Sequence, residues 1–312
     1  AASSSISFIL SLLVFTPILG VFFLLFIKAE DAKTARLIAG TITFFTLVLS
    51  SIIVYLFVLN VSDFQFVESH NWIEAIGARY IMGVDGISIW FLPLTCLLTF
   101  LVVIASTSVA KNIRAYLAFV LFLQTGMLGA FLALDLLVFY VFWELMLIPM
   151  YFLIGIWGGK NKIYAAIKFF LYTALGSLLM LVAIVYLALA HQEQFGAMSF
   201  YFADWTKLVL SGSEQFYLFL AFALAFVIKI PLFPFHTWLP DAHVEAPTGG
   251  SVILAGILLK LGLYGLIRFG IPMFPEAVVA FGPLLAILGV VGIIFGAVVA
   301  WMQTDIKKLV AY

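Results

Sequence analysis

Residues 216–239 read FYLFLAFALAFVIKIPLFPFHTWL, an apolar run in which Lys229 is the only Asp, Glu, Lys or Arg residue. A run of this length can cross a hydrocarbon layer of about 30 Å as a helix. The rise of a helix places Lys229 about 20 Å from the start of the run, near the middle of the layer. The sequence therefore predicts a transmembrane helix that carries a lysine deep inside the membrane.

Two prolines, Pro231 and Pro234, follow this lysine. Each removes one backbone hydrogen bond, which frees the carbonyl groups of Val227 and Ile230 on either side of Lys229. Free backbone groups at that depth are tolerated only where protein or water satisfies them, and broken helices of this kind mark ion sites in transporters. We expect an interruption between about Val227 and Pro234. A plain kink without an ion site is the alternative.

The apolar character extends over the whole chain, which is 65% apolar and only 10% charged over 312 residues. A soluble domain carries roughly a quarter charged residues, so we expect an integral membrane protein with an all-α, polytopic bundle of transmembrane helices. A tenth span begins near Asp305. The nine predicted spans before it are 6–27, 37–59, 86–108, 115–133, 136–158, 165–190, 216–239, 248–270 and 277–302.

The two ends of the sequence suggest a longer protein. The chain opens with Ala-Ala-Ser-Ser-Ser, without methionine, and stops at Tyr312 where an apolar segment has just begun. We expect the start to be processed or incompletely represented, and the chain to be the N-terminal part of a longer architecture, completed in the same or a second polypeptide.

Lys and Arg residues gather on one side of the predicted membrane. The opposite loops hold only Arg79, Lys207 and Arg268, while they carry many acidic residues. Because positively charged loops stay on the cytoplasmic or matrix side, we expect the N-terminus on the periplasmic or intermembrane side. The residues on the positive side are Lys28, Lys33, Arg36, Lys111, Arg114, Lys160, Lys162, Lys168, Lys307 and Lys308.

Two further charges, Lys260 and Glu144, lie inside predicted spans. Helix rise places Lys260 about 18 Å and Glu144 about 12 Å from the starts of their spans. A lysine at the membrane centre costs about 2.5–3.5 kcal/mol on insertion scales. We therefore expect Lys229 and Lys260 to face a polar interior, with Lys168 at the cytoplasmic interface, in water and without a partner.

These charges form a candidate proton relay of Glu144, Lys229, Lys260 and His236. Burial and pairing act in opposite directions on the proton affinity of a carboxylate–lysine pair, so such a pair can exchange protons near neutral pH. A second lysine nearby couples the two titrations, and a histidine titrates in the same range.

Each assignment has a structural alternative. Glu144 and Lys229 could instead form a static ion pair that fixes helix packing, although such a pair leaves Lys260 unexplained. Lys260 could donate to backbone carbonyl groups. His236 could be a polar residue at the cytoplasmic end of its span.

Other kinds of site lack support in the sequence. The single cysteine, Cys96, can form neither an internal disulfide nor the ligand set of an iron–sulfur cluster. The formal net charge is zero, and no basic tail or Gly-rich phosphate loop indicates nucleic acid or nucleotide binding. His70, His191 and His243 fall in loops or at span ends, so we expect no haem, other cofactor or metal in this chain.

Three long stretches carry a family pattern: WELMLIPM at 143–150, HTWLPDAHVEAPTGGSVILAGILLK at 236–260 and DIKKLVAY at 305–312. They resemble the antiporter-like membrane subunits of respiratory complex I, NADH:ubiquinone oxidoreductase, and most nearly those of the subunit 4 or chain M type. The resemblance covers essentially the whole chain, but members of the family have fourteen spans.

The resemblance implies an antiporter-like fold with inverted repeats, a discontinuous seventh helix, and Glu144, Lys229 and Lys260 as pump residues. It implies a three-helix segment at 1–114, a first five-helix repeat at 115–270 and the start of a second, largely missing repeat at 271–312. NADH, FMN, iron–sulfur clusters and quinone belong by the same resemblance to partner subunits. The implied partners are neighbouring antiporter-like and other membrane-arm subunits, lipids and protons, in a bacterial or mitochondrial inner membrane.

We therefore expect a proton-translocating subunit of an NADH:quinone oxidoreductase that holds no redox site itself. A subunit of a multisubunit cation/proton antiporter or of a membrane-bound hydrogenase would carry the same lysines, and the soluble partner that co-purifies would distinguish these functions. A structural membrane spacer is the third alternative. It predicts that Lys229 and Lys260 can be replaced without loss of pumping.

Overall fold

The computed structural model describes residues 8–61, 63–109 and 111–312 and is mainly helical. Within these ranges, eight helices are long and apolar enough to cross a membrane, and α1 (Ile9–Leu25) is a shorter apolar helix of 17 residues. The predicted polytopic helical architecture is confirmed. The predicted start of the first span at Ile6 lies outside the described residues.

The chain divides into two compact units, Ala1–Leu153 and Ile154–Tyr312. These units are sets of residues in mutual contact, whereas the predicted boundaries after residues 114 and 270 divide the chain into repeats. Those boundaries stay predictions.

In the first unit, helix α4 packs against four others, α1, α2, α3 and α5. Apolar runs form all these helices, and capping residues fix some of their starts. Asp31, for example, accepts a hydrogen bond of 3.0 Å from the backbone N–H of Thr34 at the start of α2. The remaining helices of this unit are α2 (Ala32–Leu56), α3 (Phe91–Ala105), η2 (Ser106–Ser108), α4 (Ile113–Leu132), α5 (Leu136–Leu145) and the first part of α6 (Leu147–Trp157).

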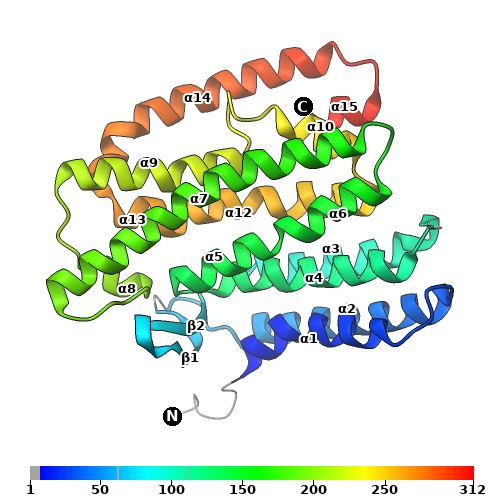
Figure 1. Cartoon of the computed structure of the whole chain (residues 1–312), viewed down its shortest axis with the longest axis horizontal. Coiled ribbons are helices and arrows are strands. Elements are labelled where there is room, and N and C mark those ends of the chain that lie inside the picture. The colour runs from blue at the N-terminus through cyan, green and yellow to red at the C-terminus, as the bar shows by residue number, and fades with distance from the viewer. Residues whose placement is uncertain (1–7, 62, 110) are drawn as a thin grey trace. The chain divides into compact units, whose positions relative to one another are not determined.

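A β-hairpin lies between α2 and α3, and the sequence did not predict it. Strand β1 (Gln65–Ile73) pairs antiparallel with β2 (Ala78–Val84), with Glu68 opposite Met82 and His70 opposite Tyr80. The short turn η1 (Glu74–Ile76) ends at Gly77, whose φ of 68° is left-handed and favours glycine. Figure 1 shows the hairpin, in cyan, beside the first turn of α1.

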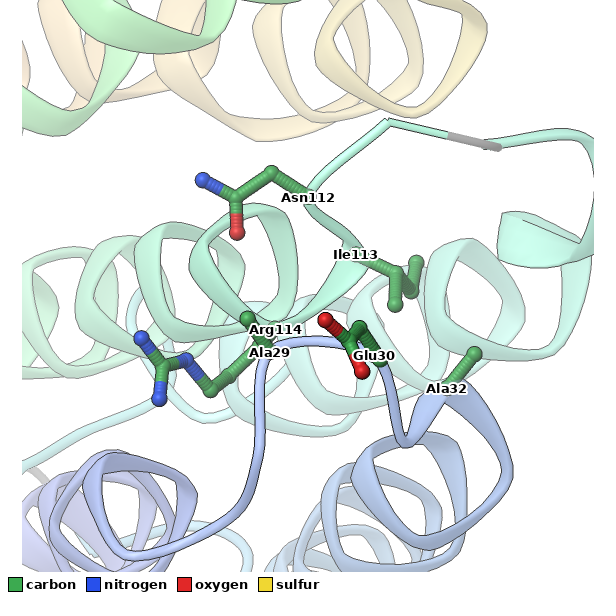
Figure 2. A pocket seen from close by; sticks show the side chains of 6 residues that line it. All are labelled: Ala29, Glu30, Ala32, Asn112, Ile113 and Arg114. Atoms are coloured by element: carbon green, nitrogen blue, oxygen red, sulfur yellow. The ribbon is translucent and has the colours of Figure 1, made fainter.

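The loops and helix starts at the other end of the first unit carry all its Lys and Arg residues except Arg79, which lies in β2. The loop between α1 and α2 meets the start of α4, where Arg114 Nη1 donates to the carbonyl of Ile27 (2.6 Å). Figure 2 shows the pocket between these segments, about 390 Å³ in volume and lined by Ala29, Glu30, Ala32, Asn112, Ile113 and Arg114. The loops of Lys33 and Lys111 thus lie at one end, opposite to Glu68 beside the start of α1, as predicted.

The second unit contains the long helix α7 and the helices packed on it. Helix α7 packs against α9 and α10, α9 packs against α12 and α14, and α15 packs against α10 and α14. Figure 1 shows α14 running alongside α9. The elements are α7 (Lys162–Phe195), α8 (Phe202–Trp205), α9 (Gly212–Lys229), α10 (Trp238–Glu245), α11 (Thr248–Ile253), η3 (Leu254–Leu258), α12 (Leu259–Gly265), η4 (Leu266–Gly270), α13 (Ile271–Met273), α14 (Pro275–Trp301) and α15 (Ile306–Ala311).

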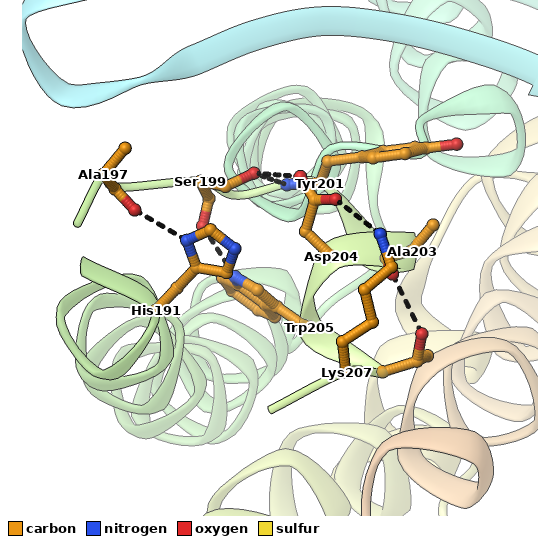
Figure 3. Close-up of polar contacts among 9 residues, drawn as sticks. His191, Ala197, Ser199, Tyr201, Ala203, Asp204, Trp205 and Lys207 are labelled. Carbon is orange, nitrogen blue, oxygen red and sulfur yellow. Dashed lines mark hydrogen bonds and ion pairs between the residues drawn. The ribbon is translucent and has the colours of Figure 1, made fainter. Parts of the chain in front are cut away.

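The loop between α7 and α9 is closed by its own polar contacts (Figure 3). The Trp205 indole donates to the carbonyl of Ser199 (2.6 Å), and the Ser199 hydroxyl donates to Asp204 Oδ2 (2.8 Å). His191 Nδ1 lies 2.6 Å from the carbonyl oxygen of Ala197. These contacts satisfy polar groups of the loop, one of them through His191 of α7.

Candidate functional site

Lys229 is the last residue of α9 and only 2% of its surface is exposed. Its neighbours in sequence, Val227 and Ile228, are also buried. At the other end of α9, Ser211 and Glu214 form a capping box that fixes where the helix begins. The predicted burial of Lys229 is confirmed, and a buried lysine requires polar surroundings.

The helix breaks immediately after Lys229, as the two prolines predict. The N–H of Leu232 donates to the carbonyl of Val227 (3.0 Å), five residues earlier, in place of the bond that Pro231 cannot donate. The Trp238 indole, at the start of α10, donates to the carbonyl of Ile228 (2.9 Å). Two backbone carbonyl groups next to Lys229 therefore accept hydrogen bonds from residues that follow the end of α9. One donor is the backbone N–H of Leu232 and the other is the indole of Trp238, and together they stabilise the interruption.

His236 lies within the break, among aromatic rings. Its ring stacks on Phe233 at 5.5 Å between centroids and meets Phe295 of α14 edge-on at 5.1 Å. Its Nδ1 is buried and has no hydrogen-bond partner within the described part of the chain. It also lines a cavity of about 110 Å³ together with Pro231 and Phe295. A proton-shuttle role for His236 stays a prediction.

Lys260 is exposed, so a closed interior around it is not found within the described residues. Helix α12 packs on α9 through Gly262, where an added Cβ would lie 2.8 Å from the carbonyl oxygen of Phe226. Lys260, two residues earlier, points about 160° away from that contact. Its Nζ donates to the carbonyl of Ala255 in the π-helical turn η3, which agrees with the backbone-carbonyl alternative.

Glu144 is half-buried and is the penultimate residue of α5. Helix α5 ends at Leu145 and α6 begins at Leu147. The break follows from Pro149, which cannot donate to the carbonyl of Leu145. The predicted disruption after Glu144 is confirmed, and Glu144 resembles Lys229 in preceding a proline-dependent break.

The prediction that Lys168 needs no partner is wrong. Its Nζ lies 2.6 Å from Asp241 Oδ2, and only 21% of its side chain is exposed. The packing of α10 against α7 brings this carboxylate to the lysine, a contact between residues far apart in sequence that no local pattern indicates.

Arg268 is a buried cation, although the sequence grouped it with the loop residues opposite the positive side. It is 6% exposed in the π-helical turn η4, where its Nε donates to the Tyr264 hydroxyl (3.3 Å). Its guanidinium carbon lies 5.4 Å from the centroid of the same ring. One feature of the sequence did indicate burial, because Arg268 lies inside the predicted span 248–270 and not beyond its end.

The α10–α11 region holds another buried group, His243, whose Nδ1 has no hydrogen-bond partner among the described residues. Nearby, Lys307 Nζ donates to the carbonyl groups of Val244 and Ala246, at 2.7 Å each. Within the described ranges, no group of three or more His, Cys, Asp or Glu residues is arranged to hold a metal ion.

The family described as "NADH:quinone oxidoreductase/Mrp antiporter, TM" matches residues 133–312, which include Glu144, Lys229, His236 and Lys260. This chain belongs to that family. Residues 12–130 match a second family, described as "NADH-ubiquinone oxidoreductase chain 4, amino terminus". The two matches together cover both compact units.

Curated relatives of the chain carry the name NADH-quinone oxidoreductase subunit M. That of Rickettsia bellii is 42% identical over 97% of this chain and 62% of its own length. That of Rhodobacter capsulatus is 47% identical over 90% of this chain and 56% of its own length. The chain thus spans about three fifths of these family members.

Among solved structures, a chain of respiratory complex I from Thermus thermophilus with bound NADH superimposes with a TM-score of 0.84. It is 33% identical, and the match covers 97% of this chain and 61% of the Thermus chain. The likeness supports the antiporter-like fold expected from the sequence.

Proposed function

We propose that this chain acts as a proton-translocating membrane-arm subunit of an NADH:quinone oxidoreductase. The observation that carries the proposal is the burial of Lys229 at the end of α9, directly before a break whose carbonyl groups are satisfied by Leu232 and Trp238. A buried amine beside an interrupted helix can change its protonation state without unfolding the bundle, because the interruption already supplies polar contacts.

In this proposal, Glu144 and Lys229 exchange protons as a coupled pair. Each charge stabilises the other across a medium of low dielectric constant, so a change at either residue alters the proton affinity of its partner. A charge arriving at Lys260 weakens that coupling, and the bond from Lys260 to the Ala255 carbonyl supplies a resting position for the protonated amine. His236 passes protons between the two lysines.

The energy would come from quinone reduction in neighbouring subunits, which would also hold NADH, FMN and the iron–sulfur clusters. No step at Glu144, Lys229 or Lys260 needs a redox group, because only protons move there. The cationic loops around Lys33 and Lys111 would face the cytoplasm or matrix, and the N-terminus the periplasm or intermembrane space, by the distribution of positive charge.

The test uses the assembled complex in sealed vesicles, with quinone reduction and membrane potential measured together. Glu144→Gln and Lys229→Ala should each lower the rate of proton pumping about a hundredfold or more, the scale typical of losing a proton-transfer group. Quinone reduction should fall with pumping because the two are coupled.

Lys160→Ala is the control, since the Lys160 side chain is exposed. Lys168 is unsuitable as a control because it forms an ion pair with Asp241. Normal pumping by Glu144→Gln at equal assembly, or equal damage from Lys160→Ala, would favour a structural spacer instead.

A cation/proton antiporter component is the second candidate, because the matched family includes Mrp antiporters. It predicts sodium-dependent proton exchange without quinone chemistry. Dependence of the vesicle signal on NADH and quinone, with no response to sodium, would exclude it.

A further inference from the structure

The β-hairpin of the first unit is fastened to α1 by a buried carboxylate. Glu68, on β1, is 3% exposed and accepts hydrogen bonds from the backbone N–H groups of Leu10 (2.7 Å) and Ser11 (3.1 Å). It also accepts one from the Ser11 hydroxyl, which in turn lies 2.9 Å from the Tyr80 hydroxyl of β2. Both strands therefore contribute to holding the start of α1.

The other strand fastens the start of α5. The linker between α4 and α5 runs beside β2, where Ala133 forms a bridge with Met82 and the N–H of Leu134 donates to the carbonyl of Ile81 (2.9 Å). Asp135 completes this junction. It is fully buried and accepts a bond of 3.1 Å from the backbone N–H of Arg79 through Oδ2.

The same carboxylate caps the helix that carries Glu144. Asp135 Oδ1 accepts from the N–H groups of Leu137 (3.0 Å) and Val138 (3.2 Å). One buried side chain thus joins β2 to the first turn of α5, and the loss of its bonds would leave several backbone donors unsatisfied in the interior.

Helix α5 is short and held along its length. It runs from Leu136 to Leu145, so Glu144 lies about 14 Å from Asp135 along the axis. Its side packs on α4 at Gly129, where an added Cβ would lie 2.4 Å from the ring of Phe142. Since α5 is one unbroken helix from Leu136 to Leu145, no break between Asp135 and Glu144 can absorb a displacement at Asp135 before it reaches Glu144.

We propose that Asp135 is a positioning residue for Glu144, which couples the place of that carboxyl group to the β-hairpin. This inference rests on the proposed function of Glu144 as a relay group. The hairpin, anchored to α1 through Glu68, gives the junction a fixed support. Asp135 acts on Glu144 through α5, whose first turn it caps.

The experiment compares Asp135→Ala with Asp31→Ala in the full complex. Asp31 also caps a transmembrane helix, α2, but it is exposed and its side chain accepts from the N–H of Thr34. The readout is the pH midpoint of the Glu144 carboxyl band in infrared difference spectra, assigned by its disappearance in Glu144→Gln. Asp135→Ala should move the midpoint by about one pH unit, because displacement changes the charges and dipoles around Glu144. Asp31→Ala should leave it unchanged.

A second variant keeps the test decisive where Asp135→Ala does not assemble. Asp135→Asn retains an acceptor for the α5 N–H groups but removes the charge, so a smaller shift of the same sign is expected. An unchanged Glu144 midpoint in the assembled variants would overturn the inference, as would an equal shift from Asp31→Ala. The pH midpoint of the Glu144 carboxyl band is measured without proton pumping, so it tests only the role of Asp135. Failure of the relay proposal would be recognised separately, because Glu144→Gln would then pump normally.

Discussion

The indole of Trp238 donates a hydrogen bond of 2.9 Å to the backbone carbonyl of Ile228 and so bridges the break that follows Lys229. Trp238 is fully buried, and its ring packs against Phe169 of α7 at 5.5 Å between centroids. The contact joins both ends of the interruption to a third helix.

Replacing Trp238 with Phe keeps an aromatic ring but removes the donor. The Ile228 carbonyl is then left unsatisfied in the interior, a loss of about 1–3 kcal/mol. We expect the assembled complex to pump several-fold more slowly, measured as membrane potential per quinone reduced. Trp205→Phe is the matched control, because it removes the indole bond to Ser199 in a loop far along the chain from Lys229. Equal losses from both variants would show only a general effect on stability.

The contact between α9 and α12 should not tolerate a methyl group at Gly262. An added Cβ would meet the Phe226 carbonyl oxygen at 2.8 Å and the Ile230 nitrogen at 2.9 Å, and these backbone atoms cannot rotate away. Gly262→Ala should therefore destabilise the protein by about 1–3 kcal/mol. Gly289→Ala on α14 meets nothing within 4 Å and should be neutral or slightly stabilising. Unfolding in mixed detergent micelles measures the stability of both variants. Similar free energies of unfolding for Gly262→Ala and Gly289→Ala would contradict the close contact between α9 and α12.

Asp135 should make stability depend on pH in the acid range. Burial raises the pKa of Asp135 from its ordinary 3.8 to about 6, while bonds from Arg79, Val138 and Leu137 and the charge of Arg79 act in the opposite sense. Because the folded-state pKa lies above the unfolded value, its stabilising contribution is complete below about 3.8 and is lost as pH rises through about 6.

As the pH rises from about 3.8 to about 6, the melting temperature of the wild type should accordingly decrease relative to that of Asp135→Asn. Asparagine does not titrate and supplies the flat reference. A temperature difference that stays constant over the same pH range would refute the raised pKa.

A buried polar contact joins three helices of the first unit. Gln124 Nε2 on α4 lies 2.8 Å from Thr46 Oγ1 on α2 and 3.6 Å from Cys96 Sγ on α3. A double-mutant cycle of Gln124→Leu and Thr46→Val should give a coupling of about 0.6–1.7 kcal/mol, the range for interhelical bonds in membranes. The cycle with Thr99→Val should give almost none, because Thr99 donates to Thr95 of its own helix (2.7 Å). Equal coupling energies in the two cycles would mean that burial of the side chains, and not the hydrogen bond between Gln124 and Thr46, determines the loss of stability.

The long helices and the breaks after Glu144 and Lys229 could be predicted because their causes are local. Apolar length determines a span, and Pro149, Pro231 and Pro234 determine where hydrogen bonds are missing. The hairpin was missed because its strands lie in a polar segment between spans, where a charged residue such as Glu68 suggests an exposed loop.

Contacts between distant residues account for the other differences. The pairing of Lys168 with Asp241 depends on how α10 packs against α7, and the burial of Asp135 depends on β2. Neither is visible in the periodicity of a single segment. Lys260 was predicted to be enclosed from membrane depth alone, whereas its direction around the helix depends on the close approach of Gly262 to α9.

The π-helical turns η3 and η4 lie before and after the seven residues of α12, which include Lys260. Each such turn holds one residue more than an α-helical turn would. Removing one residue from Leu254–Leu258 would therefore leave a regular α-helical turn in its place, and every later side chain would keep its direction about the axis. Lys260 would then stay on its present face. A chain shortened by one amino acid at this point would thus remain helical with its lysine pointing the same way.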